Sequence, residues 1–383
     1  MANYAVMNPG KGHLGHWYNA PPYHQRIYND ELEPYKNIQF KTSVLHNRRI
    51  YLGNVKVEYQ DGKKETLSDT ILKSEPAQFD KFTKRGRIDV AVGDGEDIIK
   101  LESYADRILE FKNRTLHVIN ASAKGEFLED SFKYKGVSNP QAVARTDYGV
   151  AWANEFGCYM YDGRQIHDLL EENVNRKIKQ STWSSFVTDN SMVGYNPTKR
   201  QILVIDSFKS SESSGHLYLY DIPTRSWIKG LSRVDAGNKS NFAVNPTANG
   251  ASTQLVYGKN STNNAIIIEP WSDSSQSGTI SLILKDEDFG EPHIRKKIHK
   301  VYVTAKNGDN ITLSAAVNGS ENFSDITFNS ASLTTSNSWY KTEHKVTNGG
   351  NNVESIQIKL SGSAESDFEV NDISIIYRAK GIK

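Results

Sequence analysis

The stretch HLYLYDIPTRSWIKG, residues 216–230, decides the fold class of this chain. Leucine and tyrosine alternate in its first half, which is the two-residue period of a β-strand. Asp221, Pro223 and Thr224 follow, and these residue types favour tight turns. The stretch therefore predicts two antiparallel strands joined by a short turn, with Trp227 on the returning strand.

This hairpin resembles a blade of the kelch type of β-propeller. The resemblance implies that the side chains of Asp221 and Thr224 cap the turn backbone, while Trp227 packs between adjacent blades. A weaker form of the motif, without the tryptophan, occurs at residues 157–169 (GCYMYDGRQIHDL). Because any antiparallel hairpin can carry such a turn, the propeller prediction also needs a repeat.

Strand–turn–strand units recur along the chain. We expect five, which start near Ile38, Ile98, Gln141, Ser184 and Asn241. The two middle intervals are each about 43 residues, the period of a four-stranded propeller blade, and the longer intervals contain polar insertions. The spacing predicts a β-propeller of about five to six blades, the sixth completed by the N-terminal segment or by a partner.

One segment has the spacing of a helix rather than a strand. Leu169, Leu170, Val174 and Ile178 recur at intervals close to 3.6 residues, so we expect a short inserted helix over Ile166–Gln180.

The pattern changes near Thr279, where a fresh series of alternating strands begins without the blade-like turns. About a hundred residues of this kind suit a two-sheet β-sandwich, either a jelly roll or immunoglobulin-like. The sequence thus predicts an all-β chain with an extended N-terminal arm (1–37), a propeller (38–271), a Ser-rich linker (272–278) and a C-terminal sandwich (279–383).

Composition agrees with sheet and gives no sign of a charged partner. The chain has 383 residues, 10% aromatic, and a formal net charge of +1, so no global field would attract nucleic acid or an anionic membrane. No signal peptide and no membrane span are expected from the apolar runs. The single cysteine, Cys158, follows the strand pattern and is expected to pack in the core.

The sequence contains three groups of residues that could form a metal-binding or nucleic-acid-binding site, but a structural role explains each group better. His13, His16 and His24 lack a partner at zinc spacing and suit a docking arm. The acidic run GDGED (93–97) suits a tight turn better than a calcium loop, because it lacks the later bidentate glutamate. The basic run HIRKKIHK (293–300) suits an edge or surface strand carrying gatekeeper lysines. We therefore expect no catalytic, cofactor-binding or metal-binding residues.

Five longer phrases of the chain are residues 47–82, 88–120, 136–169, 287–306 and 368–383. The first three resemble the propeller segment of tail structural proteins from tailed bacteriophages, particularly marine ones, and the last two are similar to the end of the same proteins. The resemblance implies a component of the virion tail, similar to the nozzle proteins of short-tailed phages, which form a ring of identical subunits around a DNA channel. The implied partners are other tail proteins and copies of this chain, with a hexamer as one option and DNA only as passing cargo.

The chain is shorter than most nozzle proteins, which leaves open whether it builds the channel or decorates it. Aromatic residues in the N-terminal segment could anchor a neighbouring subunit or cover an open blade of the same chain; they are Trp17, Tyr18, Tyr23 and Tyr28.

Two alternative functions remain at the sequence level. The first is a glycan- or receptor-binding tail module, in which an exposed Trp271 or Trp339 of the sandwich stacks on sugar rings. The second is a propeller glycoside hydrolase with its site at the central mouth, where loops of several blades converge.

Overall fold

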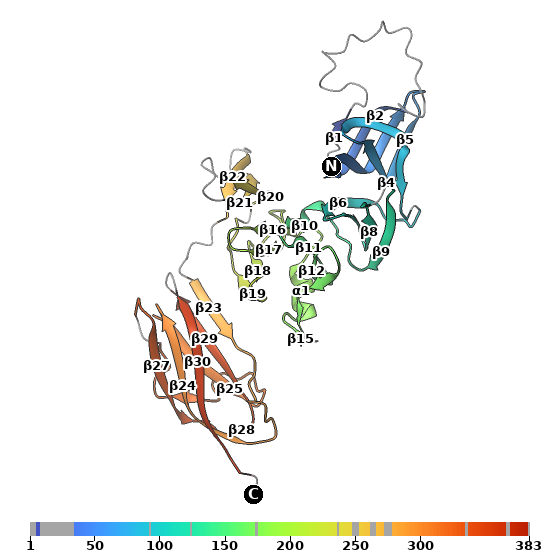
Figure 1. The fold of residues 1–383 in the computed structure, drawn as a ribbon. Helices are drawn as coiled ribbons and strands as arrows, with labels where there is room; N and C mark the ends of the chain where they lie inside the picture. The colour runs from blue at the N-terminus through green and yellow to red at the C-terminus, as the bar shows by residue number, and fades with distance from the viewer. Residues whose placement is uncertain are drawn as a thin grey trace. The chain divides into compact units, whose positions relative to one another are not determined.

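The computed structural model describes residues 5–7, 34–91, 93–122, 125–172, 175–235, 237–246, 253–260, 266–271, 278–333, 336–364 and 368–381. The chain divides into two compact units, Met1–Trp271 and Ser272–Lys383, which we call the propeller unit and the sandwich unit. Both are built almost entirely of antiparallel strands, so the all-β prediction is confirmed (Figure 1). In the described ranges, no helix is both long and apolar enough to span a bilayer.

The described part of the propeller unit contains five sheets of three or more strands, besides the two-stranded pair of β14 (Glu171–Glu172) and β15 (Asn175–Arg176). Each of the five is a meander in which every strand pairs with the next one along the chain. The first sheet contains β1 (Ala5–Met7), β2 (Tyr35–His46), β3 (Arg49–Tyr59), β4 (Lys64–Glu75) and β5 (Gln78–Asp89); the second β6 (Ile98–Tyr104), β7 (Arg107–Lys112), β8 (Thr115–Asn120) and β9 (Phe127–Lys133); the third β10 (Val143–Thr146), β11 (Gly149–Asn154), β12 (Gly157–Tyr161) and β13 (Ile166–Asp168); the fourth β16 (Met192–Asn196), β17 (Gln201–Ile205), β18 (Leu217–Asp221) and β19 (Ser226–Gly230); the fifth β20 (Lys239–Pro246), β21 (Thr253–Asn260) and β22 (Ile266–Pro270).

Adjacent sheets contact each other mainly through their first or second strands. Strand β2 contacts β6, β6 contacts β11, β10 contacts β16, and β16 contacts β20. Buried apolar side chains fill each gap between successive sheets: Ile71 and Ile108 lie in one shared cluster, Phe111 and Trp152 in the next. Radial stacking of four-stranded meanders around their first strands is the propeller plan, so the predicted fold is confirmed.

Most predicted unit starts agree with the sheets, with two corrections. The second sheet begins at Ile98 as predicted, whereas the first begins its long strand at Tyr35 rather than Ile38. The predicted fourth start, Ser184, is wrong, because it lies in the helix α1 (Gln180–Phe186) that precedes the fourth sheet at Met192. The buried Trp183 fixes this helix against the sheets, an effect of tertiary packing that strand periodicity does not register.

The first sheet is larger than an ordinary blade. Its strands β2 to β5 have 11 or 12 residues, and register shifts interrupt their pairing, for example between Gly53 and Val55. Such bulges increase the local bend and twist of a sheet. One part of the sheet packs on the second sheet through Val44 and Tyr51, while another encloses a separate core that includes Ile38 and Phe82.

The turn predicted from residues 216–230 is present. The Asp221 carboxylate accepts hydrogen bonds from the Thr224 backbone N–H at 3.0 Å and from the Thr224 hydroxyl at 2.6 Å. Trp227 packs its ring on Tyr220 and Trp183 and donates its indole N–H to the Leu169 carbonyl at 2.8 Å. Since Leu169 directly follows the last strand of the third sheet, Trp227 connects two adjacent sheets as expected.

Replacing Trp227 by phenylalanine should lower the free energy of unfolding of the propeller unit by about 1 kcal/mol, because one net hydrogen bond is lost while most ring contacts remain. Thermal or denaturant unfolding of the full chain measures the effect. The matched control is Trp339→Phe in the sandwich unit, where the half-exposed indole should tolerate the same change within about 0.5 kcal/mol. Equal effects of the two substitutions would contradict the assigned role of Trp227.

The helix expected over Ile166–Gln180 is wrong. The segment forms short strands instead, β13 paired with β12, then β14 (Glu171–Glu172) paired with β15 (Asn175–Arg176). The Asp168 carboxylate accepts the Leu170 N–H, and the Leu169 N–H donates to the Cys158 carbonyl, so the backbone is held in a turn. Leu169, Leu170 and Ile178 are buried in one core, which explains their spacing without a helix; Val174 lies outside the described residues.

The sandwich unit consists of two facing antiparallel sheets. Their inner faces share one core, with Val301 and Val303 from one sheet and Leu313 and Leu360 from the other. Each sheet pairs early strands with late ones, β23 with β29 and β24 with β30. The strands are β23 (Gly278–Ile283), β25 (Ile311–Val317) and β29 (Ile356–Ala364) in one sheet, and β24 (Lys296–Lys306), β26 (Thr327–Phe328), β27 (Tyr340–Asn348), β28 (Asn351–Val353) and β30 (Glu369–Ala379) in the other.

The basic run 293–300 is not the edge strand that the sequence suggested. Its strand β24 is central, flanked by β27, β28 and β30. Lys296 is fully buried and donates to the carbonyl oxygens of Glu291 and Glu354 at 2.7 and 2.9 Å. Lys300 pairs with Glu343 at 2.9 Å. These lysines therefore serve structure within the sheet.

Candidate functional site

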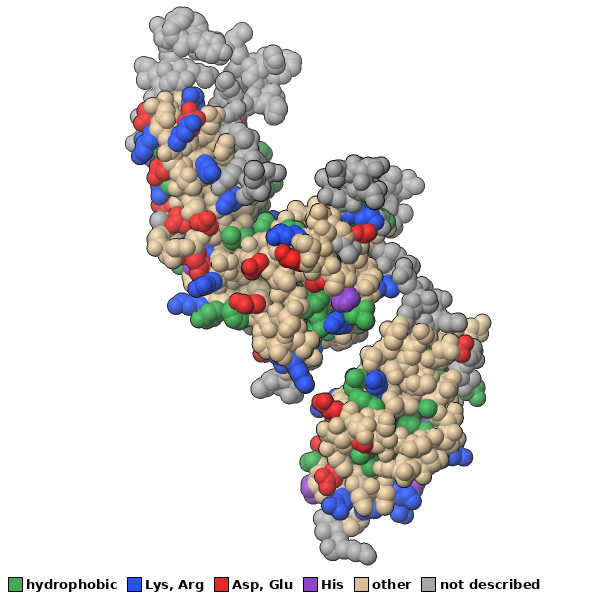
Figure 2. Space-filling model, turned by 180° about the vertical axis from the view of Figure 1, so that it is seen from behind, with side chains coloured by type: hydrophobic (Ala, Val, Ile, Leu, Met, Phe, Trp, Pro, Cys, Tyr) green, Lys and Arg blue, Asp and Glu red, His purple; other side chains and the backbone are tan. Residues whose placement is uncertain are grey.

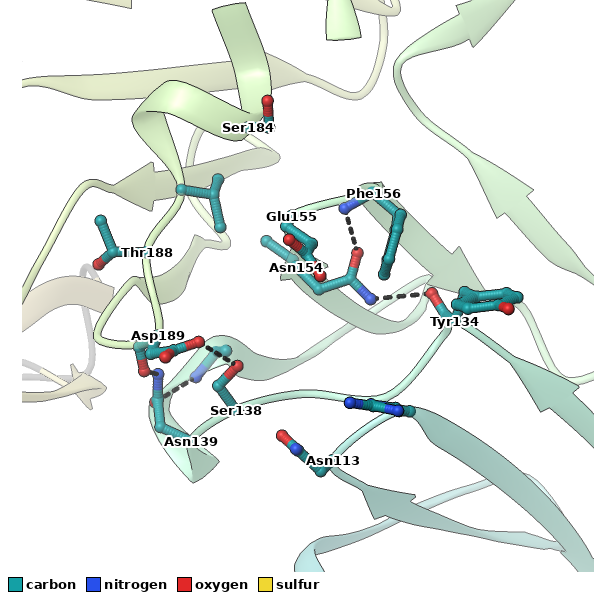
Figure 3. A pocket seen from close by; sticks show the side chains of 14 residues that line it. Asn113, Tyr134, Ser138, Asn139, Asn154, Glu155, Phe156, Ser184, Thr188 and Asp189 are labelled. Carbon is teal, nitrogen blue, oxygen red and sulfur yellow. Dashed lines mark hydrogen bonds between the residues drawn. The ribbon is translucent and has the colours of Figure 1, made fainter. Parts of the chain in front are cut away.

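A pocket of about 420 Å³ lies where loops of the second, third and fourth sheets converge (Figure 3). In a meander, the turn after the second strand and the connection after the fourth lie at the same end of the sheet, and these are the segments that line the pocket. We call it the loop pocket. Its lining residues are Asn113, Arg114, Tyr134, Ser138, Asn139, Ala142, Ala153, Asn154, Glu155, Phe156, Ser184, Val187, Thr188 and Asp189.

Two asparagine side chains hold the loops of this pocket in place. Asn154 donates to the carbonyl oxygens of Tyr134 and Gly136 at 3.0 and 2.9 Å, and its own side-chain oxygen accepts the backbone N–H of Phe156 (Figure 3). Asn139 makes a similar set of bonds, which include one to the Asp189 carbonyl at 2.8 Å. Because each amide bridges two segments, the pocket wall is fixed before any ligand arrives.

Two aromatic rings lie exposed at the pocket. Tyr134 is 59% exposed and Phe156 is 40% exposed, and their rings meet edge to face with centroids 5.2 Å apart. Tyr134 has a φ of 64°, in the left-handed region where a side chain with a β-carbon costs about 1–2 kcal/mol. Exposed apolar rings on strained backbone are a feature of binding sites, where strain is retained for function.

Charged side chains of both signs complete the lining. Arg114 and Glu155 are exposed, and the described structure gives neither side chain an ion pair. The Asp189 carboxylate accepts a hydrogen bond from the Ser138 hydroxyl at 2.9 Å and keeps further acceptor capacity (Figure 3). The pocket therefore offers two carboxylates, one guanidinium and amide groups beside two rings.

None of these residues was predicted from the sequence to belong to a binding site. They are residues of turns and of the ends of strands and helices, and they come from four segments spread over about 75 positions of the chain. The usable signal was the Asn154–Gly157 turn, where an asparagine caps a bend between two strands. The sequences of the individual turns do not reveal which of them lie at the same end of the propeller.

A second polar cluster is buried between the first two sheets. Glu110 is fully buried on β7, and neither carboxyl oxygen has a hydrogen-bond partner in the described structure. Burial raises the pKa of Glu110 to about 8, with a smaller opposing effect from Lys112 and further raising effects from Asp94 and Asp69. Although the Lys112 Nζ lies 4.0 Å from Glu110, it donates to Asp94 at 2.8 Å and to the Ala91 carbonyl at 2.9 Å. Burial therefore favours the protonated form of the Glu110 carboxyl group.

The acidic run 93–97 forms the connection between β5 and β6. Asp94 binds Lys112, and the Glu96 carboxylate accepts the backbone N–H groups of Arg114 and Thr115 at 3.0 and 3.2 Å. Both carboxylates thus have protein partners in a tight turn. In the described ranges, no group of three or more His, Cys, Asp or Glu side chains is arranged to hold a metal ion.

Other residues named from the sequence are distributed as follows. Cys158 is fully buried in the core between the third and fourth sheets, as predicted, and burial raises the pKa of its thiol. Trp271 belongs to the propeller unit and is buried against Leu255 and Tyr257, so its predicted exposure to sugars is wrong. Trp339 is 49% exposed, as that prediction requires.

The predicted N-terminal arm is described only in part. Ala5–Met7 forms β1, which pairs antiparallel with β2 of the same chain, with Val6 opposite Gln39. This short stretch extends the first sheet of its own propeller. The remaining named residues of the arm lie outside the described residues: His13, His16, Trp17, Tyr18, Tyr23, His24 and Tyr28.

Comparison with known proteins identifies no family for this chain. No family model and no curated protein matches it. Among solved structures, it resembles the mitotic checkpoint complex at 10% identity and a TM-score of 0.36, over 66% of this chain and 82% of that one. Hsv2 from Kluyvelomyces marxianus matches at 8% identity and a TM-score of 0.35, over 62% and 74%.

A glycoside hydrolase family 43 arabinoxylan arabinofuranohydrolase from Bacillus subtilis matches at 10% identity and a TM-score of 0.26, over 92% of this chain and 97% of that one. All these TM-scores are below 0.5, so the likenesses support no conclusion about the activity of this chain.

Proposed function

We propose that the protein is a structural component of a bacteriophage virion tail, which acts through protein–protein contacts in a ring of identical subunits. The resemblance of its longer phrases to tail structural proteins motivates the proposal. Charged side chains of both signs are interspersed on the face drawn in Figure 2, which agrees with the net charge of +1 and suits passage of DNA without tight binding.

The observation that carries the proposal is the apolar surface of the fifth sheet, the last of the propeller array. Ile268 on β22 is 71% exposed, the highest value among the large apolar side chains of the described residues. Ile267 on the same strand and Val244 on β20 are also exposed. Ile268 and Ile267 are consecutive on β22, so their side chains lie on opposite faces of the sheet. An apolar side chain as exposed as Ile268 on the last sheet of the array favours burial against another protein surface, and a second copy of this chain is the partner that a ring requires.

Replacing Ile268 by aspartate should weaken self-association at least about tenfold, because a charge would enter an apolar contact. Mass photometry or analytical ultracentrifugation of the full chain measures the assembly. The matched control is Ile228→Asp on β19 of the fourth sheet, which is exposed at 57% and should leave assembly unchanged.

Electron microscopy with antibody labelling of phage particles tests the location in the tail. A protein that remains monomeric at high concentration and is absent from particles would overturn the proposal.

A further inference from the structure

We propose that the loop pocket binds a neutral saccharide, a function that goes beyond a structural role in the tail. The pocket volume of about 420 Å³ falls within the range of about 300–1,000 Å³ typical of small-ligand sites and suits one or two sugar rings. Its position at the converging loops of three sheets is where a propeller scaffold presents variable side chains to solvent.

The two aromatic rings supply the apolar side of such a site. A sugar ring has a face of C–H groups that packs well against an aromatic ring, and Tyr134 and Phe156 present exposed rings at the pocket. Tyr134 stays exposed although its φ of 64° disfavours a bulky residue and its ring gains little from the core. The ring packs on Phe156 and leaves much of its surface open to a ligand at the pocket.

The polar lining matches the hydroxyl groups of a sugar. The carboxylates of Glu155 and Asp189 accept hydrogen bonds only, while the Arg114 guanidinium donates. Sugar hydroxyls both donate and accept, so they can satisfy groups of both kinds. Two carboxylates against one guanidinium repel phosphate and sulfate groups, which argues against nucleic acid and other polyanions.

The rigidity of the wall favours binding. Asn154 and Asn139 fix the loops through bonds of 2.8 to 3.1 Å, and the Asn154 carbonyl accepts the indole N–H of the buried Trp183 at 2.9 Å. A preformed site loses little conformational entropy when a ligand binds. A shallow pocket with few contacts can therefore reach useful affinity, especially when many copies act together on a polymer.

The test uses the full chain and a panel of glucose, galactose, mannose, N-acetylglucosamine, maltose and cellobiose, measured by saturation-transfer NMR and calorimetry. We expect at least one member to bind. Tyr134→Asn removes the ring but suits the left-handed backbone, so the protein should stay folded while affinity falls at least about tenfold. Phe156→Ala is a second, independent variant with the same expected loss.

The matched control is Phe127→Ala, which removes an exposed aromatic ring on β9 outside the pocket and should leave binding unchanged. Failure of the whole panel to bind would overturn the proposal. Binding that survives both pocket variants but is lost in Trp339→Ala would place the sugar on the sandwich unit and would overturn it equally. A DNA oligonucleotide that binds at Tyr134 in place of every sugar would show the wrong ligand class. None of these outcomes depends on where the protein lies in a virion.

Discussion

Replacing Trp183 with alanine is expected to lower the free energy of unfolding of the propeller unit by about 3–5 kcal/mol, the usual cost of removing a fully buried large aromatic side chain. Its ring contacts Phe186, Tyr218 and Trp227 with centroids 5.5 to 6.3 Å apart. Its indole N–H donates to the Asn154 carbonyl at 2.9 Å. The substitution therefore leaves a large cavity and an unpaired carbonyl between the third and fourth sheets.

Differential scanning calorimetry of the full chain is the suitable measurement, because the two compact units can unfold in separate transitions. Only the transition of the propeller unit should move. Trp339→Ala is the matched control, since that indole is half-exposed on the other unit and should change stability by less than about 0.5 kcal/mol. An unchanged propeller transition in the Trp183 variant would refute the packing described for α1.

Glu110→Gln is expected to stabilise the propeller unit increasingly as pH rises. The folded-state pKa of Glu110, about 8, lies above the ordinary value of 4.5 because of burial, so between these values the unfolded chain is ionised while the folded chain keeps its proton. The folded state then binds more protons, and the stability of the native protein falls with rising pH by at most about 1.4 kcal/mol per pH unit. Glutamine does not ionise and removes this loss.

The measurement is the difference in unfolding free energy between the variant and the native protein at several pH values. It should be small near pH 4 and reach several kcal/mol near pH 8. Taking the difference cancels the titration of His117, whose pKa burial lowers, and of the other nearby carboxylates. Glu129→Gln is a control on strand β9 of the same sheet, where the carboxylate is partly exposed and paired with Arg107. A flat difference for Glu110→Gln would mean that water or a rearrangement solvates the carboxylate.

Local patterns predicted much of the fold because each sheet is a meander of consecutive strands. The turn at Asp221 and the start of the second sheet at Ile98 follow from residues that are close in sequence. The helix at Ile166–Gln180 was mispredicted because three buried apolar residues at near-helical spacing can equally be anchored by short strands and turns. Periodicity records which side chains are buried but not which backbone path buries them.

The candidate site was beyond reach of the same reasoning. Tyr134, Asn154 and Asp189 lie far apart in sequence, and only the stacking of the sheets brings their turns to one end. Trp271 was predicted to be exposed but is buried, because it packs against Leu255 and Tyr257 of the neighbouring strand. Exposure of a single aromatic residue is a tertiary property that a strand pattern leaves open.

The pairing of β24 with β30 has a consequence for the order in which the protein matures during translation. Each propeller sheet closes with strands that have only just been synthesised, so those sheets can form one after another as the chain leaves the ribosome. In the sandwich unit, Lys296 pairs with Ala379, so β24 must wait until a strand about 80 residues further along the chain has been synthesised. Contacts of such long sequence separation slow folding, so we expect the sandwich unit to form more slowly than a single propeller sheet.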